Sequence, residues 1–145
     1  MPAMPRFVDD YLAYLLAAAS ARVSAEFHAE VKRAKLSVPK WRVLASLSDG
    51  EVLAVGDLAR LVLVPQPTLT KLVKRMAREG LVRASDDPAD RRRTLVRIAP
   101  RGRARVATLL AAAKAHEAKR LASFAPSEVA KLKRLLKDLI ARDTP

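Results

Sequence analysis

The feature that most constrains the fold is the segment 65–98, where a helical pattern of apolar residues gives way to an extended one. Over residues 67–79, leucine, valine and methionine recur every three or four positions, which predicts an amphipathic helix. Gly80 ends this pattern, and two extended stretches, 81–85 and 94–98, follow on either side of a polar turn. The segment therefore predicts a helix, a strand, a loop and a returning strand.

Basic and polar side chains occupy the outer face of this helix and the tip of the loop. The helix residues that we expect to contact DNA are Gln66, Thr68, Thr70, Lys71, Lys74, Arg75 and Arg78. The loop residues that we expect to do so are Arg91, Arg92 and Arg93. A basic helix followed by a basic hairpin tip suits the groove of a polyanion better than it suits a small-molecule pocket, so we interpret the segment as a DNA-binding unit.

Individual roles on the helix follow from its first turn. Pro67 disfavours helical geometry at the preceding residue, so Gln66 is predicted to be the N-cap with its side chain directed outward, where it can pair with an adenine edge. Lys71 can reach guanine, and Thr68 and Thr70 can meet phosphate or a thymine methyl group. For Thr68 the alternative is a first-turn helix residue without a ligand. The remaining cations, Lys74, Arg75 and Arg78, are expected to neutralise the DNA backbone.

The loop needs internal support, because three adjacent arginines repel one another. Asp87 and Asp90 can pair with one or two of them and fix the turn. We expect Arg91 to be paired with an aspartate, while Arg92 and Arg93 enter a narrow minor groove or grip phosphates. The alternative is a solvated charged loop, and the basic helix just before it favours DNA contact.

Charge and composition limit the class of protein. The 145 residues include 28 Lys and Arg against 15 Asp and Glu, giving a net charge of +13. Such an excess favours an anionic partner, which we take to be double-stranded DNA. No cysteine is present, which excludes disulfides and thiol redox sensing. No apolar run is long enough for a membrane span or resembles a signal peptide, so we expect a cytoplasmic protein without a membrane partner.

Most of the remaining chain has helical periodicity, and its helices fall at the two ends. The predicted helices cover 7–35, a segment capped by Ser37 and ended by Asp49 and Gly50, the compact segment 56–61, the long segment 103–124, and a last segment that starts at Pro126. Residues 53–55 are predicted to be extended. We assign residues 37–100 to a DNA-binding region and residues 1–36 and 101–145 to a helical dimerisation region.

The order of these features resembles the MarR family of bacterial transcription regulators. The resemblance rests on Asp-Pro-Ala-Asp-Arg-Arg at 87–92 with Gly102 beyond it, Gln-Pro-Thr-Leu-Thr at 66–70, and Pro-Lys-Trp-Arg-Val-Leu at 39–44. It implies a mainly α (α+β) fold, namely a winged helix-turn-helix with long terminal helices. The chain departs from the family pattern at three positions that affect helix caps: Gly56, Pro65 and Ala99.

The resemblance also implies a function. It is that of a homodimer that binds a pseudo-palindromic operator and represses transcription until a small aromatic or phenolic ligand releases it. The implied ligand crevice lies between the DNA-binding lobe and the dimer helices, and its candidate residues are Tyr11, Tyr14, Trp41 and Arg42. For Trp41 the alternative, which we favour, is a core residue on the apolar side of its helix.

Two other classes of protein compete with this interpretation. A sequence-indifferent architectural protein could bind DNA through charge alone. An enzyme is not expected, since no nucleophile with its base, phosphate-binding glycine loop or metal set is recognisable. His28 and His116 are far apart and match no metal spacing, so neither a metal nor another cofactor is predicted.

Overall fold

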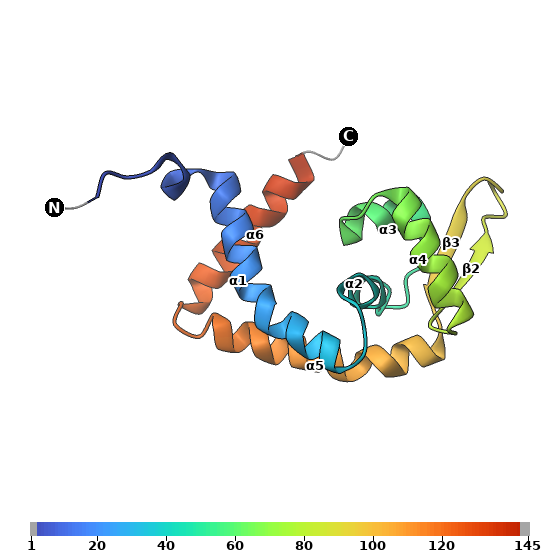
Figure 1. The fold of residues 1–145 in the computed structure, drawn as a ribbon. Helices are drawn as coiled ribbons and strands as arrows, with labels where there is room; N and C mark the ends of the chain where they lie inside the picture. The colour runs from blue at the N-terminus through green and yellow to red at the C-terminus, as the bar shows by residue number, and fades with distance from the viewer. Residues whose placement is uncertain (1–2, 143–145) are drawn as a thin grey trace.

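The computed structural model describes residues 3–142; residues 1–2 and 143–145, at the outer ends of the ranges assigned to dimerisation, lie outside it. Its elements are the 3-10 helix η1 (Phe7–Asp10), α1 (Leu12–Arg33), α2 (Val38–Ser46), β1 (Leu53–Ala54), α3 (Val55–Val62), α4 (Gln66–Arg78), β2 (Val82–Asp86), β3 (Thr94–Ile98), α5 (Pro100–Arg120) and α6 (Pro126–Arg142). Figure 1 shows a lobe formed by α2, α3, α4 and the hairpin, which α5 connects to α1 and α6.

The three strands form one antiparallel sheet in the order β1-β3-β2. The hairpin register pairs Val82 with Ile98 and Asp86 with Thr94, so β3 has the predicted bounds. Strand β2 was predicted over 81–85 and begins one residue later, at Val82. The reason is that the amide of Leu81 still donates to the carbonyl of Met76 and so belongs to the end of α4. The predicted class, mainly helical with a small wing sheet, is confirmed.

One hydrophobic core joins the helices of the lobe to the sheet. Its largest fully buried side chains are Leu44, Leu47, Leu58, Leu69, Met76 and Leu81. The inner ends of the long helices enter the same core, with Phe27 and Val31 from α1 and Val106 and Leu109 from α5. The core therefore fixes the base of each long helix against the lobe, while residues 126–142 of α6 contribute no buried side chain.

Several predicted helix bounds are wrong. The helix predicted over 7–35 is interrupted at Tyr11, whose ψ of 115° is extended, and the preceding 3-10 turn is closed by the carboxylate of Asp9 on the amide of Arg6. The helix predicted over 103–124 begins at Pro100, which needs no amide hydrogen in a first turn, and ends at Arg120. Periodicity predicted the helical character of both segments but not these local breaks, and of the apolar positions on α1 only Phe27 and Val31 are buried.

Gly102 lies inside the first turns of α5 for a steric reason. A Cβ atom at this position would lie 2.1 Å from the carbonyl oxygen of Leu81 and 3.0 Å from a methyl group of Leu44. Only glycine allows α5 to pass this close to the backbone of Leu81, which follows the end of α4. Among residues 3–142, no helix combines the length and apolar character that crossing a membrane requires.

Candidate nucleic-acid interface

Helix α4 has one buried face and one charged face. Leu69, Val73 and Met76 are almost fully buried against the lobe. The cations Lys71, Lys74, Arg75 and Arg78 are exposed. Because residues three and four apart share one side of a helix, the buried triplet leaves these cations facing solvent.

The start of α4 differs from the prediction. Its N-cap is Pro65, which has extended geometry and offers no side-chain cap, and Gln66 is the first helical residue rather than the cap. The carbonyl of Gln66 accepts the hydroxyl of Thr70 at 3.0 Å, so that hydroxyl is already engaged within the helix. Thr68 is exposed on the first turn. A proline at the N-cap leaves first-turn amides without a side-chain acceptor, where they can face an anion.

The Gln66 side chain lies beside α3. A Cβ atom built on Gly56 would be 3.3 Å from Oε1 of Gln66, so the glycine leaves room for this amide between the two helices. Gln66 is nevertheless exposed at the tip of α4. The side chain of Gln66 therefore lies beside α3 at the surface, from the first helical position of α4 rather than from the predicted N-cap.

The wing consists of strands β2 and β3 and the turn 87–93 between them, and this turn is ordered by hydrogen bonds. The amide of Asp87 donates to the carbonyl of Arg93 at 2.9 Å, and the amide of Arg93 donates to the carbonyl of Asp90 at 2.9 Å. The carboxylate of Asp87 also accepts the amide of Ala89 at 2.9 Å. Asp87 and Asp90 therefore stabilise the wing through its backbone as well as through its charges.

The arginines are paired differently from the prediction. Arg93 contacts Asp87 of the wing (Nη1 to Oδ2, 3.5 Å) and Asp57 of α3 (Nη2 to Oδ2, 3.7 Å). Arg92 pairs with Asp90 at 3.2 Å. Arg91, which we expected to be the paired arginine, makes no ion pair with any residue between 3 and 142. Arg93, the arginine nearest β3, therefore contacts both the turn and α3.

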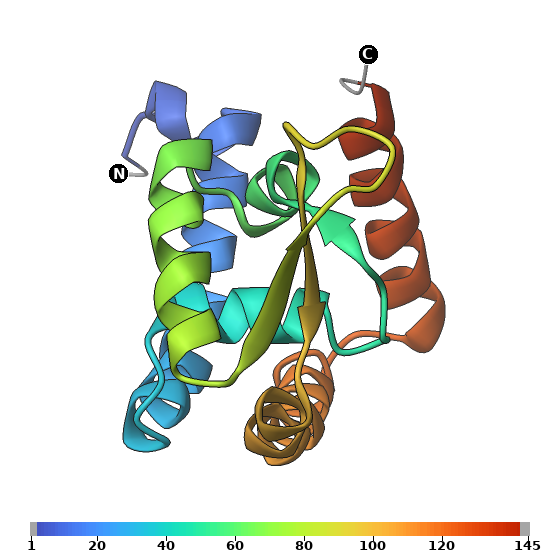
Figure 2. The same ribbon diagram turned by 90° about the vertical axis from the view of Figure 1, so that its right-hand side faces the viewer.

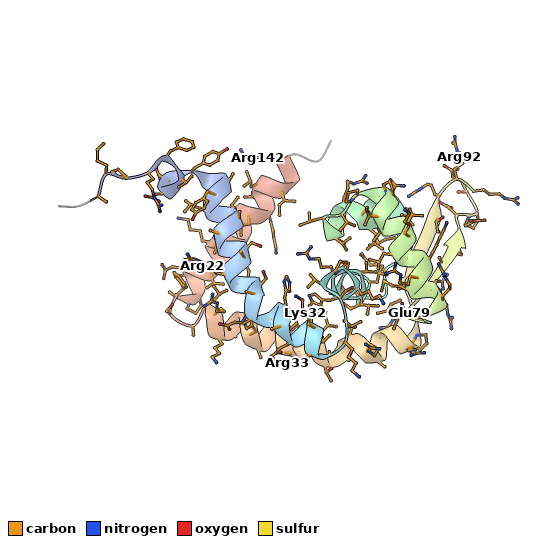
Figure 3. The ribbon with its side chains drawn as sticks, viewed as in Figure 1. Arg22, Lys32, Arg33, Glu79, Arg92 and Arg142 are labelled. Carbon is orange, nitrogen blue, oxygen red and sulfur yellow. The ribbon has the colours of Figure 1, made fainter. Side chains whose placement is uncertain are left out.

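The wing and α4 border an open groove on one side of the molecule. The groove has a volume of about 560 Å³, and Gln66, Lys74, Arg92 and Arg93 contribute to its lining. Figure 2 shows α4 and the hairpin side by side on the face turned toward the viewer. The side chain of Arg92 is 93% exposed and lies at the wing tip in Figure 3. Five of the ten predicted helix and loop residues line this groove, and the other five are exposed outside it: Thr68, Lys71, Arg75, Arg78 and Arg91.

Asp57 and Arg60 were not predicted to belong to this surface. They form an ion pair within α3 and line the same groove, and Asp57 also pairs with Arg93. The contact from α3 to the wing spans 36 positions of the chain, so no local pattern could indicate it. The only local signal was the spacing of an acid and a base three residues apart, which is common on exposed helices.

The four candidate ligand residues do not meet within one chain. Trp41 packs edge-on against Phe27 with ring centroids 5.0 Å apart, which matches the core alternative. Tyr14 precedes Phe27 by 13 residues, or about 20 Å along α1, and is 43% exposed. Tyr11 contacts the ring of Phe7 instead. A pocket containing both tyrosines and Trp41 would need another chain.

The histidines have separate environments. Burial, and secondarily the charges of Arg42 and Lys32, lower the pKa of His28 below its ordinary value. His116 on α5 lies 3.2 Å from a carboxylate oxygen of Glu26 on α1 and so joins two long helices. Within residues 3–142, no three His, Cys, Asp or Glu side chains are grouped as a metal site would require.

A basic helix packed on a helix pair, followed by a basic β-hairpin and flanked by long helices, defines the winged helix-turn-helix class. The profile of the MarR family matches residues 34–93. A MarR family transcriptional regulator from Silicibacter pomeroyi DSS-3 is 39% identical; the match covers 94% of this chain and 98% of that one, with a TM-score of 0.83. The chain belongs to the MarR family of transcriptional regulators, which confirms that family and the expectation of a regulator rather than an enzyme.

Two further proteins resemble the chain. The transcriptional repressor IacR of Pseudomonas putida is 33% identical over 90 residues, or 62% of this chain and 54% of the repressor. The chain spans about half the length of the curated relatives it matches first. The structure of BpsR from Bordetella bronchiseptica, whose DNA binding is regulated by 6-hydroxynicotinic acid, is 27% identical with a TM-score of 0.78, covering 98% of this chain and all of that one.

Proposed function

We propose that the protein is a homodimeric regulator that binds a pseudo-palindromic DNA operator, with residues 37–100 contacting DNA and residues 1–36 and 101–145 forming the dimer. The observation that carries the proposal is a groove to which α4 contributes Gln66 and Lys74 and the wing contributes Arg92 and Arg93. Helix α4 has the length of a recognition helix and would lie in the major groove, with Arg91 and Arg92 at the adjacent minor groove or phosphates.

The dimer is supported by apolar surface that one chain leaves uncovered. On α6, Leu132, Leu135 and Leu139 are 50%, 51% and 41% exposed although they form one stripe. On the outer half of α1, Leu12 and Leu15 are 56% and 43% exposed. Exposed apolar surface of this kind on helices is typical of an interface with another chain. Two chains joined there would present two copies of α4 to successive major grooves, about 34–36 Å apart.

Repression relieved by a small aromatic or phenolic ligand completes the proposal. It is supported by the similarity to BpsR and by the environment of α2, where Trp41 and Arg42 face the base of α1. The two tyrosines of a second chain could complete a pocket there. The ligand would act by binding more tightly to the dimer whose α4 helices have the wrong spacing for DNA.

Selection of bound fragments from the native genome, followed by footprinting, tests the proposal. The expected result is a shared inverted repeat whose half-sites are about one helical turn apart. Enriched fragments without any inverted repeat would contradict a dimeric regulator.

The architectural alternative is favoured by the net charge of +13 alone, and it predicts a different result. Competition with bulk genomic DNA at fixed salt separates the two functions. A regulator should keep an advantage of about 10³ or more for its operator, whereas an architectural protein should keep almost none.

A further inference from the structure

The C-terminal end of α4 is tied to α2 by a charged pair distant in sequence. Nζ of Lys40 lies 2.8 Å from each carboxylate oxygen of Glu79, and the two residues are 39 positions apart. The side chain of Lys40 is only 18% exposed and that of Glu79 is 38% exposed. Among the lysine and arginine ion pairs of residues 3–142, Lys40 is the least exposed cation, and its pair has the smallest combined exposure of the two side chains.

Each charge of the pair is unfavourable for its own helix. Lys40 is the third residue of α2, where the partial positive charge of a helix N-terminus repels an ammonium group. Glu79 is the C-cap of α4, where the partial negative charge repels a carboxylate. Neither residue therefore stabilises its own helix through its charge. The favourable interaction of each charge is the ion pair between them.

The same end of α4 is also held by α5. Gly80 has a φ of +76° and turns the chain toward the sheet, and Leu81 follows it into the core. The carbonyl of Leu81 accepts the amide of Ala99 at 3.0 Å, next to the close approach of Gly102. The helix that leads to the proposed dimer interface thus starts where the recognition helix ends. Figure 3 shows Glu79 at that end of α4.

We propose that Lys40 and Glu79 are positioning residues for operator binding, which set the angle of α4 relative to the dimer helices without contacting DNA. The 13 residues of α4, Gln66–Arg78, span about 20 Å, so a rotation of about 5° at Glu79 moves the Gln66 end by almost 2 Å. A displacement of that size exceeds what a hydrogen bond to a base tolerates. The pair therefore acts on the register and spacing that the dimer recognises.

The link also has a regulatory consequence. Lys40 immediately precedes Trp41 and Arg42, and the Trp41 ring packs on Phe27 of α1. A shift of α2 relative to α1 moves Lys40, and Lys40 carries the end of α4 with it. The inference rests on the proposed function, and it assigns to this pair a direct polar connection from α2, which packs on α1, to the end of the recognition helix.

The test uses the full-length protein and DNA carrying the inverted repeat that the wild type selects, with the half-site spacing lengthened or shortened by one base pair. The variants are Lys40→Met, Glu79→Gln, Lys40→Arg and the charge swap Lys40→Glu with Glu79→Lys. The matched control is Glu30→Gln, which removes an equally charged partner from an exposed pair within α1. Thermal denaturation of each variant verifies that it folds.

Lys40→Met and Glu79→Gln are expected to bind the native spacing about 2- to 30-fold more weakly, with a flatter preference among spacings and unchanged binding to random DNA. The control and Lys40→Arg should keep the wild-type preference. The charge swap should restore it, because glutamate suits the start of α2 and lysine suits the end of α4.

Other results overturn the inference. Single variants that fold and keep the wild-type spacing preference would contradict it, while leaving the proposed function intact. The same holds if the swap folds and restores thermal stability but not the preference, since the pair would then be structural only. A wild type that selects no inverted repeat would overturn the proposed function and this inference together.

Discussion

Helices α4 and α6 have similar amphipathic patterns but opposite surroundings. The apolar face of α4 is covered within the chain, with Leu69 and Met76 fully buried, whereas Leu132 and Leu135 on α6 remain about half exposed. The same periodicity therefore specifies an internal contact in one helix and an unfilled contact in the other. The apolar face of the recognition helix is thus covered within one chain, whereas that of α6 is the face that we propose a second chain covers.

The largest effect is expected from variants that disrupt the proposed contact between the α6 helices of two chains. Replacing Leu135 and Leu139 by aspartate together should raise the dimer dissociation constant by about 10³-fold or more, because each buried leucine contributes about 1.5–3 kcal/mol and both subunits change. Analytical ultracentrifugation measures this effect. Arg134→Asp, on the opposite side of α6, is the control and should remain dimeric. A wild type that sediments as a monomer would remove the basis of the comparison.

The second test weakens the covered face of α4. Leu69→Ala should lower the free energy of unfolding by about 2–5 kcal/mol, since it leaves a cavity in the core. Chemical denaturation measures the loss. Leu61→Ala, at a leucine that is 58% exposed on α3, should change stability by only about 0.5 kcal/mol. Comparable losses for both variants would mean that the outer surface of the lobe is also covered in solution.

The third test separates two roles on the exposed face of α4. Gln66→Ala should relax the preference for one base pair by about 1–3 kcal/mol, while leaving binding to random DNA unchanged. Lys74→Met should instead weaken binding to all sequences alike and reduce the salt slope by about one unit. Titrations at several salt concentrations measure both. Equal losses of Gln66→Ala on operator and random DNA would refute its role in base recognition.

The fourth test compares neighbouring arginines of the wing. Arg91→Ala should weaken DNA binding by about tenfold without a change in stability, because Arg91 has no ion-pair partner among residues 3–142. Arg93→Ala should lower stability by about 0.5–1 kcal/mol, since it removes the exposed contacts to Asp57 and Asp87. Fluorescence anisotropy and thermal melting distinguish them. The reverse pattern would support the arginine roles expected from the sequence.

The smallest expected effect is the contribution of His28, on α1, to the pH dependence of stability. The pKa of His28 in the folded protein lies below its ordinary value near 6.5, so the unfolded chain binds the proton more readily. Stability should therefore fall as the pH decreases through 6.5 toward the folded pKa, and His28→Gln should reduce that fall. Thermal melting between pH 8 and 5 measures it. An equally steep decrease in His28→Gln would assign the pH dependence to other groups.

Much of the fold followed from local patterns that physical chemistry makes dependable. Apolar spacing located the buried face of α4, Gly80 located its end, and the run 94–98 gave β3 its bounds. The break at Tyr11 was missed because it depends on a local cap at Asp9 rather than on periodicity. The start of α5 was missed because Pro100 was taken as a junction, although proline is well suited to a first helical turn.

The candidate site divides in the same way. The residue types on α4 and in the wing, and the aspartates that fix the turn, could be predicted since they are close in sequence. Which arginine pairs could not be predicted, because Asp57 reaches Arg93 only after α3 packs beside the hairpin. Likewise, the sequence left Trp41 as either a core residue or a ligand contact, and only the tertiary structure showed that it packs on Phe27 at the edge of the core.

The sequence by itself determined the family, the order of elements and the concentration of positive charge on one helix and one loop, since each depends on neighbouring residues. Only the tertiary structure decided which charges are neutralised and which remain free. It also joined Lys40 to Glu79 and left α6 uncovered. Long-range pairing and solvent exposure are properties of packed surfaces, and no spacing along the chain encodes them.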